Sequence, residues 1–315
     1  MKRYRIDNWA QYNTALVQRG SITVWIEEDS IERWVAKQEK GKRGRPKRYS
    51  DEAILMLLLL REVYHLPLRG LQGFISSLFS FMGVRLPVPC YSQICRRAKH
   101  MKKALKRYKK RSAIDLVFDS TGLKVYGEGE WKVRKHGAGK RRTWKKLHLG
   151  IDLSTQEIVV AELTDRDGGD AATAEKMLDK IKAPLGQVLG DGAYDGSAFR
   201  KKVYDQGGDL PVPPPRNASY KGAKDGWQRK RDAALAEIQG LGGDDDARAL
   251  WKKLTSYHRR SLVETAMYRF KQIFGGRLRS RSSQNQVAEI HCKCLILNKM
   301  TRLGLPRGEW VEQAA

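Results

Sequence analysis

Cysteine and long apolar runs are scarce in this chain, and acidic side chains are far fewer than basic ones. The four cysteines, at positions 90, 95, 292 and 294, are too few and too unevenly spaced for a disulfide framework in 315 residues. The longest apolar run, Ala53 to Leu60, has eight residues, whereas a membrane helix needs roughly 20. These absences exclude a disulfide-stabilised secreted scaffold and a membrane-spanning protein.

The excess of basic over acidic side chains leaves a large positive charge. Lys and Arg number 61 against 35 Asp and Glu, so the formal net charge is +26. An excess of this size favours a polyanionic partner, and nucleic acid is the first candidate. The opening residues, MKRYRIDNWAQYN, contain no apolar signal core, so we expect a cytoplasmic protein.

Residues 1–112 are predicted to form a helical region of helix-turn-helix type. The spacing of apolar residues, a serine cap and two prolines place helices over residues 9–19, 51–64 and 68–82 and from Tyr91 onward. The short apolar run Ser21–Ile26 is predicted to be a strand instead.

The segment 41–48 within this region is strongly basic. Its Arg43-Gly44-Arg45-Pro46 sequence resembles the core of an AT-hook, in which extended arginines enter the narrow minor groove of A·T-rich DNA. The match covers only four residues, so a basic linker that contacts phosphates is the alternative.

The predicted helix that begins at Tyr91 has a cationic face. Between Arg96 and Arg111 there are ten Lys or Arg and no acid. A helix that is apolar on one side and cationic on the other suits a DNA groove or backbone. A merely solvated face, which is the alternative, would normally include acids. We therefore predict that Arg96, Arg97, Lys99 and Lys103 contact DNA.

From Ser112 the sequence changes to short β-prone runs separated by Gly and Asp. A buried strand, Ile114–Phe118, is predicted to end at Asp119, and a short strand from Val188 is predicted to close on Asp191. The other expected elements are a strand over residues 123–126, a hairpin of residues 147–153 and 157–163, and helices over residues 171–181 and 197–206. This pattern predicts a mixed sheet with helices.

A basic loop with two tryptophans lies inside this region. It holds eight Lys or Arg and no acid between Trp131 and Lys146. Cations interleaved with aromatics can hold a phosphate backbone and stack on a displaced base, although packing in a hairpin explains the tryptophans equally well. We expect His148, beside this loop, to contact DNA or to be exposed. The predicted DNA contacts are Trp131, Lys135, Arg141, Arg142, Trp144 and Lys145.

The segment YHRRSLVETAMYRFK, residues 257–271, predicts an amphipathic helix. Tyr257, Arg260, Glu264 and Lys271 fall on one side of it, opposite the apolar residues. The simplest interpretation is a solvated face with an i,i+4 ion pair between Arg260 and Glu264. A functional interpretation requires that other acids lie beside Glu264.

Two aspartates elsewhere are the candidates for such neighbours. Asp119, Asp191 and Glu264 are 72 and 73 positions apart, so only the tertiary structure can group them. An all-oxygen cluster suits Mg²⁺ or Mn²⁺. Two such ions can activate an attacking oxygen and stabilise the leaving 3′-oxygen of a phosphodiester. The two cations and the phenol on the same helix stripe would then contact the DNA backbone.

The spacing Y-x2-R-x3-E-x6-K that starts at Tyr257 resembles the signature of bacterial insertion-sequence DDE transposases. Asp191-Gly192-Ala193-Tyr194-Asp195 is similar to the region around the second acid of that family, and Phe118-Asp119-Ser120-Thr121 to the region around the first. Residues 8–20 and 131–149 resemble the insertion-sequence-five (903-like) branch. The resemblance spans nearly the whole chain.

This resemblance implies an α/β protein with an RNase H-like mixed-sheet catalytic core and an all-helical N-terminal DNA-binding region. Asp119, Asp191 and Glu264 would be catalytic and would bind two Mg²⁺ ions, for which Mn²⁺ substitutes. The implied activity is metal-dependent cleavage at the ends of an insertion element, followed by attack of the freed 3′-hydroxyl on target DNA, in a cut-and-paste or related reaction.

The same resemblance implies partners and a location. Double-stranded DNA would be bound both as terminal inverted repeats and as target, and a homodimer or larger assembly would form on it. The protein would be bacterial, cytoplasmic and nucleoid-associated. The predicted organisation is a DNA-binding region at 1–112, a first core part at 113–215, a polar insertion with one short helix at 216–256, and the C-terminal helices of the core at 257–315.

Two other functions are consistent with parts of the sequence. A non-catalytic helix-turn-helix DNA-binding protein would explain the charge and the N-terminal helices. A structure-selective nuclease, such as a junction resolvase, would share the metal chemistry but would cleave branched DNA without joining 3′ ends to a target.

Overall fold

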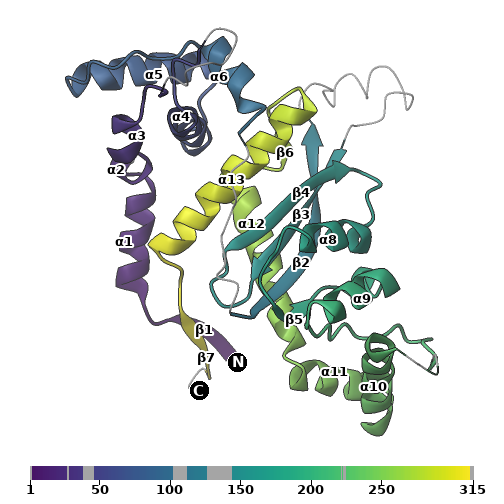
Figure 1. The fold of residues 1–315 in the computed structure, drawn as a ribbon. Helices are drawn as coiled ribbons and strands as arrows, with labels where there is room; N and C mark the ends of the chain where they lie inside the picture. The colour runs from purple at the N-terminus through teal and green to yellow at the C-terminus, as the bar shows by residue number, and fades with distance from the viewer. Residues whose placement is uncertain are drawn as a thin grey trace, which may run out of the picture. The chain divides into compact units, whose positions relative to one another are not determined.

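The computed structural model describes residues 2–26, 28–37, 46–101, 112–125, 144–220, 222 and 225–312. The chain divides into two compact units. The helices and strands of both are labelled in Figure 1. The first unit joins Met1–Lys103 to Ser282–Ala315, and the second is Ala104–Arg281. Residues 282–315 therefore group with the N-terminal part of the chain, whereas the sequence-based prediction assigned them to the core.

The first unit consists of helices and one small sheet. Its helices are α1 (Trp9–Arg19), α2 (Ile22–Trp25), α3 (Glu28–Glu32), α4 (Asp51–Val63), α5 (Leu68–Phe81), α6 (Tyr91–Ala98) and α13 (Ser283–Leu303). Strands β1 (Lys2–Ile6) and β7 (Gly308–Glu312) pair antiparallel, which the sequence did not reveal. No described helix has both the length and the apolar composition needed to cross a membrane.

The strand predicted over residues 21–26 is wrong, because Ile22–Trp25 is helix α2. A run of so few apolar residues fits the helical and the strand period equally well. The tertiary structure decides between them: Trp25 is buried, and its indole N–H donates to the carbonyl of Arg19 at 2.9 Å. That bond fixes a tight connection after α1.

Helices α4 and α13 form the centre of the first unit. Ser50 caps α4 as predicted, with its hydroxyl accepting from the Ala53 amide at 3.0 Å. Lys293 on α13 is buried against α4, with its ammonium 2.6 Å from Glu289 and 4.0 Å from Glu62. Buried charges are tolerated only when they are paired in this way, so these three residues tie the two helices together.

Two phenylalanines on α5 provide a matched test of this core. Phe79 is 2% exposed and packs edge-on against Trp34, with ring centroids 5.0 Å apart, whereas Phe81 is 92% exposed. We expect Phe79→Ala to lower the free energy of unfolding by about 3–5 kcal/mol. Phe81→Ala should change it by no more than about 0.5 kcal/mol. Urea denaturation followed by tryptophan fluorescence measures both, and equal effects would contradict this assignment of the core.

Within the described residues, the second unit contains one five-stranded mixed sheet. β2 (Ile114–Val125) pairs antiparallel with β3 (Trp144–Asp152), and β3 pairs antiparallel with β4 (Ile158–Asp165). The other edge of β2 pairs parallel with β5 (Leu185–Leu189) and, further along, with β6 (Arg277–Leu278). The order β4-β3-β2-β5, with three antiparallel strands beside a parallel one, confirms the predicted RNase H-like α/β fold.

Strand β2 continues through Asp119, whereas the sequence predicted that a strand would end there. β3 pairs with β2 from Leu116 to Lys124, so the two short strands predicted on either side of Ser120 are one. The cause is the partner strand, because its ladder of hydrogen bonds holds a polar stretch that local sequence would leave as a turn. Asp119 therefore lies inside a strand of the sheet centre.

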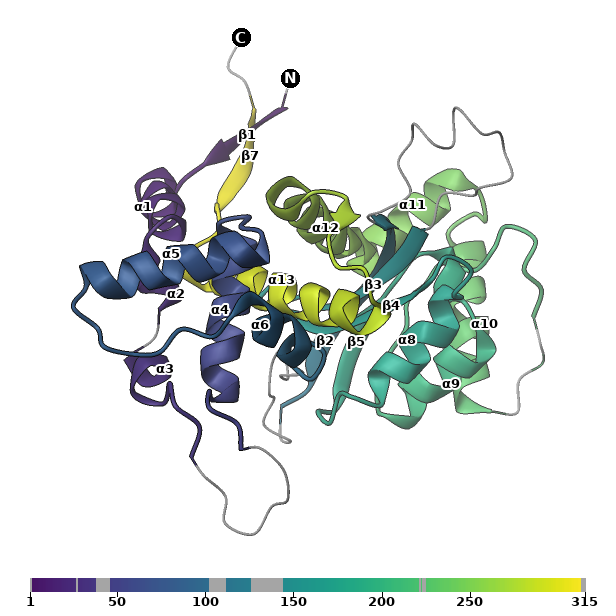
Figure 2. The same ribbon diagram turned by 90° about the horizontal axis from the view of Figure 1, so that it is seen from above.

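Different helices cover the two faces of this sheet (Figure 2). α8 (Asp170–Leu178) and α9 (Ser197–Asp205) pack on the face that carries Phe118, in one apolar cluster. α12 (Ser261–Phe274) packs on the opposite face, against β2 and β3. Because side chains alternate along a strand, Asp119 lies on the face toward α12.

The predicted insertion contains two helices where one was expected, α10 (Gly226–Gly240) and α11 (Asp245–Leu254). Ala234, Ile238 and Trp251 form a small apolar cluster between them. The acids at 244–246 look like loop residues in the sequence, but negative side chains stabilise a helix N-terminus. Asp244 caps α11 by accepting from the Ala247 amide at 2.8 Å.

Candidate active site

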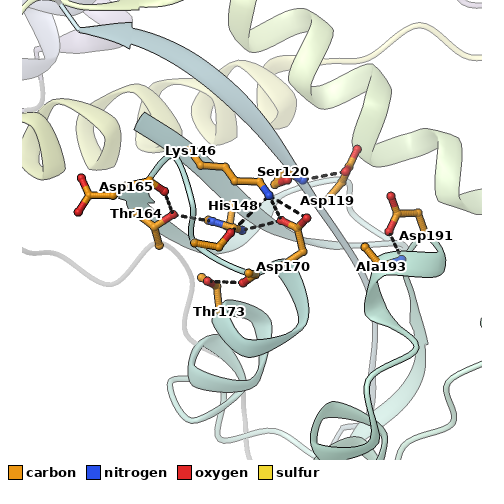
Figure 3. A network of polar contacts seen from close by, with 12 residues as sticks. Asp119, Ser120, Lys146, His148, Thr164, Asp165, Asp170, Thr173, Asp191 and Ala193 are labelled. Atoms are coloured by element: carbon orange, nitrogen blue, oxygen red, sulfur yellow. Dashed lines mark hydrogen bonds and ion pairs between the residues drawn. The ribbon is translucent and has the colours of Figure 1, made fainter. Parts of the chain in front are cut away.

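Asp119 lies on β2, and Asp191 follows the end of the neighbouring parallel strand β5. Val117 pairs with Leu189, and each aspartate is two residues further along its chain. The register therefore brings Asp191, which caps the 3₁₀ helix η1 (Gly192–Tyr194) just beyond β5, near Asp119, and its charge acts on the Asp119 carboxylate. Figure 3 shows the hydrogen bond that orients each: Asp119 accepts from the Ser120 amide at 2.7 Å, and Asp191 from the Ala193 amide at 2.9 Å.

The pKa of Asp119 shows that further charges converge on it. Burial raises this pKa, and the negative charges of Asp191 and Glu264 raise it further. The Ser120 amide and the Arg260 guanidinium act in the opposite direction. The three acids therefore lie within one another's electrostatic field, which the spacing in the sequence could not establish.

Glu264 sits in the first turn of α12, which is anchored by the buried side chains of Val263, Ala266 and Phe270. Its carboxylate is 51% exposed and forms an ion pair with Arg260 at 2.5 Å. This is the i,i+4 pair expected from the sequence. Lys271, two turns further along the helix, is exposed.

Asp119, Asp191 and Glu264 offer the kind of ligands that a divalent cation needs. Carboxylate oxygens are the ligands that Mg²⁺ and Mn²⁺ prefer, and a bound cation would offset the negative charges that raise the pKa of Asp119. Among the described residues, no three His, Cys, Asp or Glu side chains are gathered closely enough to hold an ion as they stand. The three acids have the oxygen atoms and the negative charge that a divalent cation requires. In this structure the carboxylate of Glu264 is paired with Arg260.

Tyr257, a predicted DNA contact, is hydrogen-bonded to the protein backbone in this structure. It begins the short 3₁₀ helix η2 (Tyr257–Arg260), and its hydroxyl donates to the carbonyl of Gly190 at 3.0 Å. Burial is the main cause that raises the pKa of this phenol. The hydroxyl is thus bonded to the residue that precedes Asp191.

A second polar cluster joins β3 to the start of α8 (Figure 3). His148 is 1% exposed, with its Nε2 2.9 Å from the hydroxyl of Thr164. Lys146 donates to Asp170 at 2.8 Å. Burial lowers the pKa of His148, against the opposing charge of Asp170. The expectation that His148 would be exposed or contact DNA is therefore wrong, and the cluster fixes α8 on the sheet.

The predicted DNA contacts differ in how they are placed. Arg96 and Lys99 are exposed on α6. Arg97 is used inside the unit, where it donates to the Tyr49 carbonyl at 2.8 Å and forms an ion pair with Asp51. Lys145 donates to Asp165 at 2.5 Å, and Trp144 is half-buried beneath Lys124. Outside the described residues lie Arg43, Arg45, Lys103, Trp131, Lys135, Arg141 and Arg142.

The fold is thus RNase H-like, with one aspartate on β2, a second just beyond the end of β5, and a glutamate on helix α12. Two family models, both described as a transposase DDE domain, match this chain at residues 17–128 and 110–299. The second match covers more than half of the chain. The chain belongs to this transposase family, and the DDE transposase resemblance seen in the sequence is confirmed.

Solved transposase structures show distant likeness. The piggyBac transposase synaptic complex with hairpin DNA is 11% identical, with 94% of this chain and 76% of that chain covered and a TM-score of 0.42. The Mos1 strand transfer complex is 12% identical, with 77% and 83% covered and a TM-score of 0.23. The Mos1 mariner paired end complex with Mn is 13% identical, with 85% and 93% covered and a TM-score of 0.21. These values are too low to carry an argument about function.

Proposed function

We propose that this transposase binds the ends of an insertion element, cuts them with divalent metal ions held by Asp119, Asp191 and Glu264, and joins the freed 3′ ends to target DNA in a cut-and-paste or related reaction. The observation that carries the proposal is the pairing of Val117 with Leu189, which brings Asp191 near Asp119 beside the helix that carries Glu264; the charges of the two other acids also contribute to the raised pKa of Asp119. Three carboxylates in one field are a suitable ligand set for Mg²⁺, with Mn²⁺ as a substitute and two ions per site.

The chain's own residues prepare this site. Bound ions would supply Lewis acidity that activates the attacking oxygen and stabilises the leaving 3′-oxygen. Glu264 must leave Arg260 to join the two aspartates, and the freed guanidinium then binds a non-bridging phosphate oxygen of the DNA. Lys271, exposed on the same helix, neutralises a further phosphate. Ion binding and phosphate binding are therefore coupled through one side-chain exchange.

The first unit supplies DNA affinity in this proposal. Arg96 and Lys99 project from α6 into solvent, and cations that protrude from a packed helix suit the DNA backbone. The AT-hook-like segment 41–48 and the basic loop that begins at Trp131 remain predicted contacts. Because two element ends must be cut and joined together, the DNA-bound form is proposed to be at least a homodimer, in the bacterial cytoplasm on the nucleoid.

The test is a cleavage assay with the purified full chain. End-labelled duplexes that carry the ends of the element are incubated with Mg²⁺ or Mn²⁺ and a supercoiled target plasmid. The expected result is a nick at the element boundary that leaves a 3′-hydroxyl, followed by labelled plasmid, with neither product in EDTA. Binding without any cut would favour the non-catalytic DNA-binding protein, and cleavage of branched DNA without joining would favour a structure-selective nuclease.

A further inference from the structure

The backbone before Asp191 is held from two sides. On one side, a Cβ added to Gly190 would lie 2.7 Å from the ring of Tyr194, which is buried, so only glycine lets the chain pass this close. On the other side, the Tyr257 hydroxyl donates to the Gly190 carbonyl at 3.0 Å. The peptide group between Gly190 and Asp191 is therefore held by the ring of Tyr194 on one side and the hydroxyl of Tyr257 on the other.

The turn that delivers Tyr257 is itself fixed to the sheet. Gln187 on β5 donates from its side-chain amide to the Thr255 carbonyl at 2.9 Å. Arg259 donates to the Leu153 carbonyl at 3.3 Å and lies 3.7 Å from the carboxylate of Asp115. These bonds attach both ends of the turn to β5, β2 and the residue after β3, so the Tyr257 side chain projects from a rigid base.

The backbone of the same turn is in an unfavourable conformation at Ser256. Ser256 has a φ of 56° in the left-handed region, which is unfavourable for a residue with a side chain. Such a conformation persists where the surrounding structure requires it. Here it reverses the chain between α11 and η2, and it directs Tyr257 toward β5.

The chemistry of the phenol limits its other roles. A tyrosine hydroxyl has one proton to donate, and that proton is given to Gly190. Phosphate oxygens only accept hydrogen bonds, so this hydroxyl cannot donate to DNA without releasing the carbonyl. A bond from this hydroxyl to DNA, as predicted from the sequence, would therefore compete with the bond to Gly190.

We propose that Tyr257 is a positioning residue, which holds the Gly190 carbonyl and so fixes where Asp191 presents its carboxylate to the divalent ions. The inference rests on the proposed metal-dependent function. Partners of this kind, one step removed from the ligands, typically change metal affinity by about 10–100-fold when they are removed. A DNA contact would instead change affinity for DNA in the absence of metal.

The test compares Tyr257→Phe with Tyr64→Phe in the full chain. Tyr64 is a matched control because its hydroxyl also donates to a glycine carbonyl, that of Gly20, at 3.2 Å in the first unit. Three quantities are measured: the affinity for element-end DNA in EDTA by fluorescence anisotropy, the Mn²⁺ concentration for half-maximal nicking, and direct Mn²⁺ binding by the electron paramagnetic resonance signal of free Mn²⁺.

For Tyr257→Phe we expect about a 10-fold higher Mn²⁺ requirement and a matching loss of Mn²⁺ affinity, with DNA affinity in EDTA unchanged within about two-fold. Tyr64→Phe should change neither metal quantity. Weaker DNA binding with an unchanged Mn²⁺ requirement would overturn the proposal in favour of a DNA contact, and so would equal metal effects in both variants. If the wild type bound Mn²⁺ but never nicked DNA, the proposed function would fail, while the resonance measurement would still decide the role of Tyr257.

Discussion

The variants Asp119→Asn and Glu264→Gln are expected to nick element ends at least about 10³-fold more slowly than the wild type. Asn and Gln keep the size of the side chain and remove the charge that holds a divalent ion. Asp119 lies on the face toward α12 and Glu264 lies in the first turn of that helix, so both substitutions fall within the second unit. Binding of end DNA in EDTA should therefore stay within about two-fold of the wild type.

The control for these substitutions is Asp205→Asn. Asp205 ends α9 and is exposed, on the side of the sheet away from α12. Single-turnover nicking with labelled ends measures all three variants, and Asp205→Asn should cut at the rate of the wild type. Full activity in Asp119→Asn or Glu264→Gln would show that these acids do not hold the ions, and the enzymatic proposal would then fail.

The second large effect concerns salt. With six to ten phosphate contacts, the affinity for DNA should fall by about 10³–10⁵ between about 50 and 200 mM salt. The net charge of +26 makes a contact number in this range reasonable. Anisotropy titrations in EDTA at several salt concentrations give the slope of log affinity against log salt. A nearly flat slope would mean that most of the cations are paired within the protein.

Helix α6 offers matched variants for this measurement. The double variant Arg96→Ala with Lys99→Ala removes two exposed cations and should reduce the salt slope by about two without changing thermal stability. Arg97→Ala should instead lower the melting temperature, because Arg97 bonds to the Tyr49 carbonyl and to Asp51. If Arg97→Ala changed the salt slope more than the double variant, Arg97 would be the DNA contact, and the assignment of Arg96 and Lys99 to that role would be wrong.

Local pattern was sufficient for much of the catalytic unit. The apolar side of the segment 257–271 predicted a packed helix, and α12 buries those residues. Alternation predicted the β3–β4 hairpin. At the turn of this hairpin, Asp152 accepts from the amide and hydroxyl of Ser154 at 2.8 and 2.6 Å, as Asp commonly does in turns. These features succeed because the information lies within a few residues of each position.

Long-range pairing could not be predicted in the same way. Asp119 resembled a strand end because Gly and Thr follow it, but β3 keeps that stretch in the sheet. Tyr257 bonds to a carbonyl 67 positions away, and Asp115 accepts from the Gln187 amide and pairs with Arg259, both distant in sequence. Helix α13 follows the motif helix in sequence yet groups with the N-terminal unit. A periodic pattern shows which face is apolar and does not show what covers it.

The turn between α10 and α11 has a practical consequence. Gly242 and Gly243 are exposed, both have positive φ, and the two helices they join have their own apolar cluster. Exposed loop tips with small residues tolerate added sequence well. A short peptide tag or a fluorophore attachment site placed here should leave Asp119, Asp191 and Glu264 undisturbed. Assembly of the protein on paired DNA ends could then be followed by energy transfer between labelled copies.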